Sequence, residues 1–156
     1  MTKVALMGAG GKMGLRLASN LMKSDHDVLH VEIDPVGQQR LKDETGIDCV
    51  GQGQALSNAE AVILAVPDRL IGKVLNGFID DLKPGTAVIM LDAAAPHAET
   101  LPKRADITYF VAHPCHPPLF NDETDPDARK DYFGGIAAKQ HIICALGQGP
   151  EEHYAM

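Results

Sequence analysis

Short apolar runs alternate with segments of helical periodicity along most of this chain. Patterns long enough for one strand each occupy residues 3–7, 28–34, 61–66, 87–91 and 107–112, and the second of them ends in acidic residues. Between two of them, Leu70, Ile71, Val74, Leu75 and Phe78 recur at the spacing of one helix face. Alternation of this kind predicts right-handed crossovers and an α/β fold with a doubly wound, mostly parallel sheet.

Other elements follow from shorter patterns. Helices are predicted over 36–42, 69–79 and 93–104, and the helix after the first strand carries Leu15, Leu17, Ala18, Leu21 and Met22. A brief strand is predicted at 47–50 and a turn at 51–53. Residues 140–146 are predicted as a seventh strand, with a helix as the alternative.

Residues 113–134 differ in character, because prolines and acidic residues replace the apolar periodicity. They predict a long loop, and loops of that length are uncommon unless they serve a function. Proline and two acids at 150–152 then resemble the start of a helix. We therefore expect a nucleotide-binding domain over 1–147, and in 148–156 the start of a helix leading to a C-terminal domain that this chain lacks.

Four glycines fall within seven positions just after the first strand, at Gly8, Gly10, Gly11 and Gly14. So many glycines are entropically costly unless something must approach the main chain closely. The spacing fits either GxGxxxG or GxxGxxG, because Met13 occupies the third glycine position of a strict GxGxxG. A strand, a tight turn and a helix N-terminus together favour binding of a pyrophosphate.

Acidic residues end the second strand, where Glu32 lies 18 residues after Gly14. A carboxylate at this position can accept hydrogen bonds from both ribose hydroxyls and repel a 2′-phosphate, which predicts NAD as the cofactor. Glu32 is the first candidate for this role and Asp34 the second. Asp34 precedes Pro35 and could equally begin a turn or cap a helix.

The carboxyl ends of the other strands should border the same crevice. Small and acidic residues gather there, and with the glycine turn they complete the predicted cofactor site: Lys12, Met13, Ala65, Val66, Pro67, Asp68 and Asp92. Lys12 could contact a phosphate, although solvent exposure is its alternative.

Histidine and thiol side chains follow the strand at 107–112. His113 and His116 are candidate catalytic residues, because imidazole can hydrogen-bond a substrate hydroxyl or carboxylate at neutral pH. The alternative for His113 is a structural role in the proline-rich loop. Lys139 is a third, weaker candidate. The spacing of His113, Cys115 and His116 matches no defined metal site, so we predict no metal.

Composition and charge exclude several classes of binding partner. The net charge of −7 and the lack of a basic cluster argue against binding to nucleic acid or an anionic membrane. The sequence shows neither a membrane-length apolar run nor a signal-peptide pattern, so we expect a cytoplasmic protein. Three widely spaced cysteines indicate no disulfide framework.

The motifs GAGGKMG, VEID, AVILAVPD and LKPGTAVIMLDAA, in this order, resemble the 6-phosphogluconate and prephenate dehydrogenase-like branch of Rossmann oxidoreductases. Within that branch, HPCHPPLFNDE and AAKQHIICALGQGPEE resemble the bacterial D-apionate oxidoisomerase group. This resemblance implies NAD-linked oxidation of a hydroxylated sugar acid, coupled to a skeletal rearrangement. It also implies a helical second domain that supplies homodimer contacts, so we expect the chain alone to be inactive.

Two alternatives remain open at this point. One is a non-catalytic NAD-binding or sensor module, although a sensor has no need of the histidine-rich loop. The other is an NADPH-dependent reductase of the dihydrodipicolinate reductase type, which shares the GxxGxxG variant but is opposed by Glu32.

Overall fold

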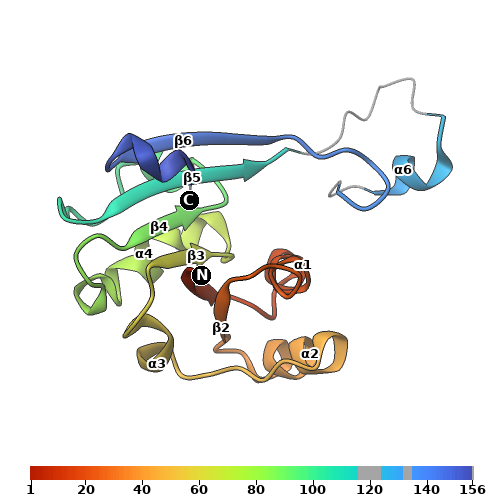
Figure 1. Ribbon diagram of the computed structural model, residues 1–156, viewed down its shortest axis with the longest axis horizontal. Coiled ribbons are helices and arrows are strands. Elements are labelled where there is room, and N and C mark those ends of the chain that lie inside the picture. Colours follow the sequence, from red (N-terminus) through yellow and green to blue (C-terminus); the bar gives the residue numbers. More distant parts are fainter. Residues whose placement is uncertain (116–123, 132–134, 156) are drawn as a thin grey trace.

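A single sheet organises the chain in this computed structural model, which describes residues 1–115, 124–131 and 135–155. Six strands of the described residues lie in the order β2-β1-β3-β4-β5-β6 (Figure 1). They are β1 (Lys3–Met7), β2 (Asp27–Val31), β3 (Ala61–Leu64), β4 (Ala87–Met90), β5 (Thr108–Pro114) and β6 (Ile142–Gln148). Neighbouring strands are parallel except for β5 and β6, which are antiparallel. The predicted doubly wound, mostly parallel sheet is confirmed.

Helices connect the parallel strands. The α-helices are α1 (Lys12–Leu21), α2 (Pro35–Thr45), α3 (Gln52–Leu56), α4 (Ile71–Asn76), α5 (Ala94–His97) and α6 (Pro126–Lys130). Short 3₁₀ helices are η1 (Asp68–Leu70), η2 (Ile79–Asp81) and η3 (Glu151–Ala155). None of the helices in the described residues is both long and apolar enough to cross a membrane.

Alternate side chains of β1 and β3 enter two separate cores. Leu6 of β1 packs with Ala18 of α1 and Leu41 of α2 on one face of the sheet. On the other face, Leu64 of β3 packs with Leu75 of α4 in a larger cluster. Each fully buried leucine contributes about 1.5–3 kcal/mol, so the unbroken apolar runs require helices on both faces.

The ends of α2 show how the sequence sets a helix locally. The Asp34 carboxylate accepts the N–H of Val36 at 3.2 Å, and Pro35 takes the first helical position. At the other end, Gly46 adopts φ +75° and its N–H donates to the carbonyl of Lys42. An Asx cap, an N1 proline and a left-handed glycine are the preferred start and stop signals of a helix.

The predicted strand at 47–50 is wrong. Only one backbone hydrogen bond links this segment to β2, from the N–H of Val50 to the carbonyl of His30 at 2.9 Å. The segment forms no ladder of strand hydrogen bonds, and its apolar side chains pack into the two cores. Ile47 and Cys49 join the core of Leu6, and Val50 joins the core of Leu64. The predicted turn at 51–53 is also wrong, since α3 begins at Gln52.

Two predicted helices differ from expectation, and the last strand is shifted along the chain. The helix predicted over 69–79 is divided into η1 and α4, and the helix predicted over 93–104 is limited to α5. The strand predicted at 140–146 is confirmed as β6, two residues further along, so the helical alternative is wrong. After it, the 3₁₀ helix η3 forms, and the Tyr154 hydroxyl accepts the N–H of Leu146 at 2.9 Å.

Candidate functional site

Two cavities flank the point where the sheet changes winding direction. β1 lies between β2 and β3, and the helices that follow β1 and β3 pack on opposite faces. Crevices at the carboxyl ends of such strands are the usual ligand sites of doubly wound sheets. One cavity, of about 510 Å³, opens beside α1 and β5, and the other, of about 360 Å³, opens beside Glu32 and α4.

Three of the four clustered glycines are required by packing. A Cβ on Gly8, whose φ is +79°, would lie 2.6 Å from the carbonyl oxygen of Ala65. A Cβ on Gly10 would lie 2.3 Å from the oxygen of Gly37, and one on Gly14 only 2.0 Å from the oxygen of Gly8. These contacts assign the motif as GxGxxxG, the first of the two predicted spacings.

Gly11 differs from the other three, because a Cβ there would make only ordinary contacts, with its nearest atom at 3.4 Å. Gly11 is the N-cap of α1, and no side chain caps this end of the helix. The first turn of α1 also contains no acidic residue. Since Gly11, Lys12 and Met13 line the 510 Å³ cavity, the open helix N-terminus is available there to an anionic ligand.

The Glu32 carboxylate lies at the opposite side of the glycine turn. One oxygen accepts the N–H of Gly10 at 3.1 Å, and the other accepts the N–H groups of Ile33 at 2.8 Å and Asp34 at 3.0 Å. Glu32 lines the 360 Å³ cavity together with Gly8. The carboxylate is thereby fixed in orientation, and the oxygen bonded to Gly10 keeps one lone pair that can accept a further hydrogen bond.

Gly37 of α2 makes room for this arrangement, and the sequence analysis missed it. A Cβ at Gly37 would lie 2.8 Å from Cγ of Glu32, and its backbone packs on Gly10. A glycine inside a predicted helix was the available signal, since such a glycine usually has a packing or functional reason.

Most of the predicted cofactor residues line the two cavities. The 510 Å³ cavity is lined by Gly11, Lys12, Met13, Ala65, Val66, Pro67, Asp68 and Asp92, and the 360 Å³ cavity by Gly8, Glu32 and Val66. Gly10 and Gly14 line neither, because they pack against Gly37 and Gly8. Asp34 also lines neither, since it caps α2; of its two predicted interpretations, the structure supports the cap.

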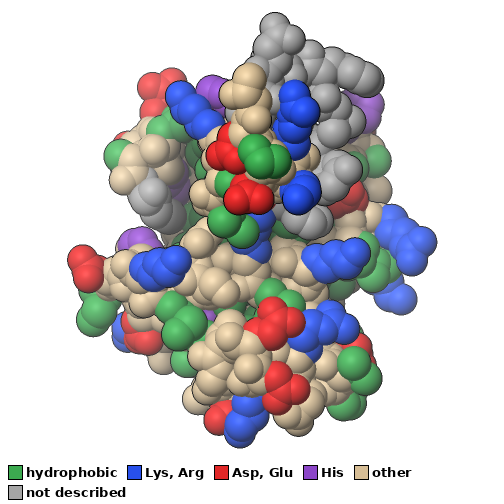
Figure 2. Space-filling view, turned by 90° about the vertical axis from the view of Figure 1, so that its right-hand side faces the viewer, with side chains coloured by type: hydrophobic (Ala, Val, Ile, Leu, Met, Phe, Trp, Pro, Cys, Tyr) green, Lys and Arg blue, Asp and Glu red, His purple; other side chains and the backbone are tan. Residues whose placement is uncertain are grey.

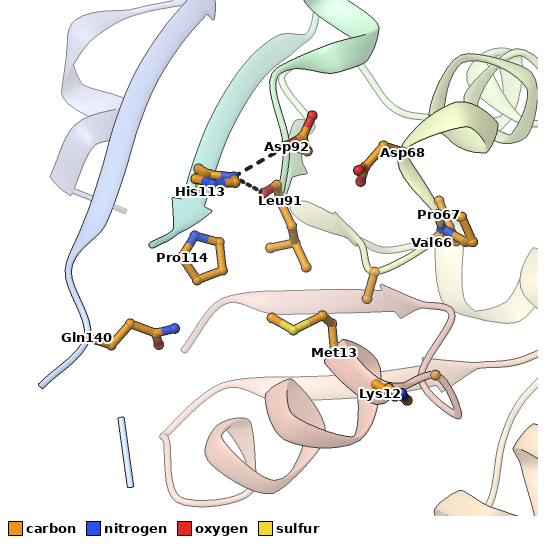
Figure 3. A pocket seen from close by; sticks show the side chains of 12 residues that line it. Lys12, Met13, Val66, Pro67, Asp68, Leu91, Asp92, His113, Pro114 and Gln140 are labelled. Carbon is orange, nitrogen blue, oxygen red and sulfur yellow. Dashed lines mark hydrogen bonds and ion pairs between the residues drawn. The ribbon is translucent and has the colours of Figure 1, made fainter. Parts of the chain in front are cut away.

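His113 enters the 510 Å³ cavity from the end of β5 (Figure 3). Its Nδ1 lies 2.9 Å from the carbonyl oxygen of Leu91 and 3.5 Å from Oδ2 of Asp92. A carbonyl oxygen only accepts, so Nδ1 carries the proton and Nε2 of the neutral ring is an acceptor. The other oxygen of Asp92 accepts the N–H of Ala94 at 2.6 Å, which fixes the carboxylate beside the imidazole.

Of the other two catalytic candidates, the structure describes only Lys139. His116 lies outside the described residues. Lys139 is exposed, and its neighbour Gln140 lines the cavity instead, with Leu91 and Pro114. Sequence analysis missed Gln140 because only the antiparallel direction of β6 brings its first residues to the carboxyl end of β5.

No group of three metal-ligating side chains occurs in 1–115, 124–131 and 135–155. On the face shown in Figure 2, Lys and Arg side chains are interspersed with Asp and Glu over the described residues. This face therefore carries no continuous basic surface among those residues.

The fold and the glycine turn define the chain as a Rossmann-type domain. Residues 3–96 match the family described as NADP oxidoreductase coenzyme F420-dependent, and the chain belongs to that family. Residues 121–156 match the family described as phosphogluconate dehydrogenase (decarboxylating) C-term.

Close relatives carry more specific names. The chain is 64% identical to a D-apionate oxidoisomerase of Cupriavidus necator, over 97% of this chain and 55% of the relative. It is 62% identical to a D-apionate oxidoisomerase of Rhizobium rhizogenes, over 100% of this chain and 57% of the relative. The chain thus spans about half the length of these curated relatives.

A solved structure is equally similar. A semialdehyde dehydrogenase NAD-binding protein from Cupriavidus necator, in complex with calcium and NAD, superposes with a TM-score of 0.92 at 62% identity. The match covers 99% of this chain and 56% of that chain.

Proposed function

We propose that this chain is the NAD-binding half of an oxidoreductase that acts on a hydroxylated sugar acid of the D-apionate type. The observation that carries the proposal is the pairing of an uncapped α1 N-terminus at Gly11 with the Glu32 carboxylate across the glycine turn. A dinucleotide needs both features, since its pyrophosphate seeks N–H donors and its adenosine ribose seeks an acceptor.

The two cavities fit the two halves of the cofactor. The cavity beside Glu32 is lined by Val66, Leu70 and Val74, which suits an adenosine, and the cavity beside His113 suits a nicotinamide and a small substrate. A pyrophosphate between them would lie against Gly11, where a side chain is missing and the helix N–H groups are open.

NAD is favoured over NADP by charge. Glu32 faces the cavity with a carboxylate whose two oxygens are held by three backbone N–H groups. A 2′-phosphate at this position would meet a fixed negative charge, while a 2′-hydroxyl would donate to it. This argument opposes the alternative of an NADPH-dependent reductase.

His113 is the proposed acid–base residue. When bound, NAD supplies the hydride acceptor for oxidation of a carbinol carbon. Nε2 of His113 accepts the proton of the hydroxyl, while Nδ1 stays bonded to the carbonyl of Leu91. The carboxylate of Asp92, 3.5 Å away, stabilises the imidazolium that forms. A sensor module would have no use for this pair.

We further propose that the domain over 1–147 belongs to a longer cytoplasmic protein that forms a homodimer through a C-terminal domain. The length of the relatives, of which the chain covers 55–57%, supports the part of this proposal that concerns a longer protein. His116 and Lys139 stay candidates for substrate contacts in that longer protein.

Two measurements test the proposal. Fluorescence titration of the chain with NADH and NADPH should show tighter binding of NADH. The full-length protein that carries this chain should form NADH from NAD and D-apionate, followed at 340 nm. Tighter binding of NADPH would refute the assigned role of Glu32, and failure to oxidise any sugar acid would refute the substrate class.

A further inference from the structure

The segment 135–138 precedes Gln140, which lines the 510 Å³ cavity. Its organising residue is Asp131, whose Oδ2 accepts three consecutive backbone N–H groups, of Ile136 at 2.9 Å and of Ala137 and Ala138 at 3.1 Å each. Three donors on one carboxylate oxygen fix the main chain closely. The N–H groups, Ile136 foremost, and the charge of Arg16 hold the pKa of the Asp131 carboxyl below its usual range.

The same segment packs against a side chain of α1. Gly135 has φ +79° and donates its N–H to the carbonyl of Ala138 at 2.6 Å. A Cβ on Gly135 would lie 2.9 Å from the guanidinium of Arg16 and 3.4 Å from Oε1 of Gln140. Gly135 therefore packs between a side chain of α1 and the carboxamide of Gln140.

Strand pairing fixes Gln140 from its other side. The N–H of Cys115 donates to the carbonyl of His141 at 2.8 Å, and Pro114 pairs with Ile142. The start of β6 thus lies beside the end of β5. Figure 3 shows Gln140 and His113 on the same side of the cavity, with Pro114 between them and Val66 on the opposite side.

We propose that Gln140 binds the sugar-acid substrate through its carboxamide and that Asp131 is the residue that positions it. This inference rests on the proposed function and adds the specificity element of the same site. A carboxamide has N–H donors and an acceptor oxygen, so it can bind a carboxylate oxygen or a hydroxyl without adding charge.

The surroundings favour a neutral donor at this position. Two carboxylates, Asp68 and Asp92, already line the cavity, and His113 accepts the hydroxyl proton. A substrate carrying its own carboxylate needs donors that hold it away from these acids. Gln140 supplies them on the side of the cavity formed by β5 and β6.

The test compares Gln140→Leu with wild type in the full-length protein, using D-apionate and NAD. Gln140→Leu removes hydrogen bonds to a charged group, so kcat/KM should fall by about 10- to 100-fold, mainly because KM rises. The dissociation constant of D-apionate for the NADH-loaded protein, measured by calorimetry, should rise by the same factor, while NADH affinity stays constant. Gln140→Glu should lose more, because it adds a like charge, and Gln140→Asn should retain part of the binding.

Gln54→Leu is the matched control, since Gln54 is an exposed residue of α3 and should leave every constant unchanged. Asp131→Ala should also raise KM, and Asp131→Asn, which keeps one acceptor oxygen, should raise it less. In a double-mutant cycle, Asp131→Ala should add nothing further in the Gln140→Leu background, because it acts through Gln140.

The outcomes separate the two levels of the proposal. If wild type oxidises D-apionate and Gln140→Leu does so with an unchanged KM, the assignment of Gln140 is overturned while the proposed function stands. Full additivity of the two substitutions overturns the positioning role of Asp131. If wild type itself oxidises no sugar acid, the proposed function fails, and the assignment of Gln140 fails with it.

Discussion

The carboxylate of Glu32 accepts the backbone N–H of Gly10 at 3.1 Å, which ties the end of β2 directly to the glycine turn after β1. The acid that would bind a ribose is thus held by the turn that would bind the pyrophosphate. A change at either residue should therefore alter both the turn and the cofactor preference.

Glu32→Gln tests this link through cofactor discrimination. The amide removes the negative charge and places an NH₂ group where one oxygen accepted a backbone N–H, so NADH affinity should fall by about 10-fold. NADPH affinity should fall less or rise, because repulsion of the 2′-phosphate is lost. The ratio of the two dissociation constants, from fluorescence titration, is the measurement. An unchanged ratio would contradict the role of Glu32.

Gly14 and Gly11 should respond differently to the same small substitution. A Cβ on Gly14 meets the oxygen of Gly8 at 2.0 Å, so Gly14→Ala should lower the free energy of unfolding by about 2 kcal/mol or more. A Cβ on Gly11 has no atom nearer than 3.4 Å, so Gly11→Ala should change the free energy of unfolding by only about 0.5 kcal/mol.

Cofactor affinity separates these glycines further. Gly11→Ala places a methyl group at the open N-terminus of α1, and NADH affinity should fall at least about 10-fold, or roughly 1.4 kcal/mol. Urea unfolding and NADH titration of both variants check the pair. Normal NADH binding by Gly11→Ala would place the pyrophosphate elsewhere.

The sequence was sufficient for the parallel part of the sheet because its central strands β3 and β4 are unbroken apolar runs. The run at 61–66, for example, contains all of β3 and Ala65, which borders Gly8. Local signals such as Asp34 and Pro35 likewise marked the start of α2. These features depend on burial and capping, which are properties of neighbouring residues.

The remainder depends on contacts between distant parts of the chain. Residues 47–50 have the apolar pattern of a strand, but their side chains pack into two different cores. The spacing of apolar residues does not reveal this division between two cores. Gln140 joins the cavity only because β6 is antiparallel, and the strand direction is not encoded in a seven-residue run. The choice between the two glycine spacings likewise required the contact of Gly10 with Gly37.

His30 should make stability depend on pH. Burial lowers the pKa of its imidazole, and its Nε2 has no hydrogen-bond partner in the described residues. The folded state therefore keeps the ring neutral, whereas the unfolded state binds a proton below about pH 6.5. Since the unfolded state binds more protons in that range, the free energy of unfolding should fall as pH drops from about 6.5 toward the lowered pKa.

His30→Leu should flatten this dependence, because the variant has no ring to protonate. Urea unfolding of the chain between pH 5 and 8 measures it, with His26→Leu, an exposed histidine, as the matched control. An identical slope for wild type and His30→Leu would show that other groups cause the dependence.

His113 should affect turnover and not cofactor affinity. Its Nδ1 donates a hydrogen bond to the carbonyl of Leu91, so Nε2 is the nitrogen that can accept a proton from a substrate hydroxyl as a general base. His113→Ala in the full-length protein should lower kcat for D-apionate by about 10²-fold or more, with the dissociation constant of NADH unchanged. His97→Ala, at the exposed end of α5, is the control and should match wild type.

Asp92→Asn keeps the hydrogen bond to Ala94 but removes the charge beside the imidazolium, so it should lower kcat less than His113→Ala does. Wild-type kcat in His113→Ala would leave only a structural role for this histidine.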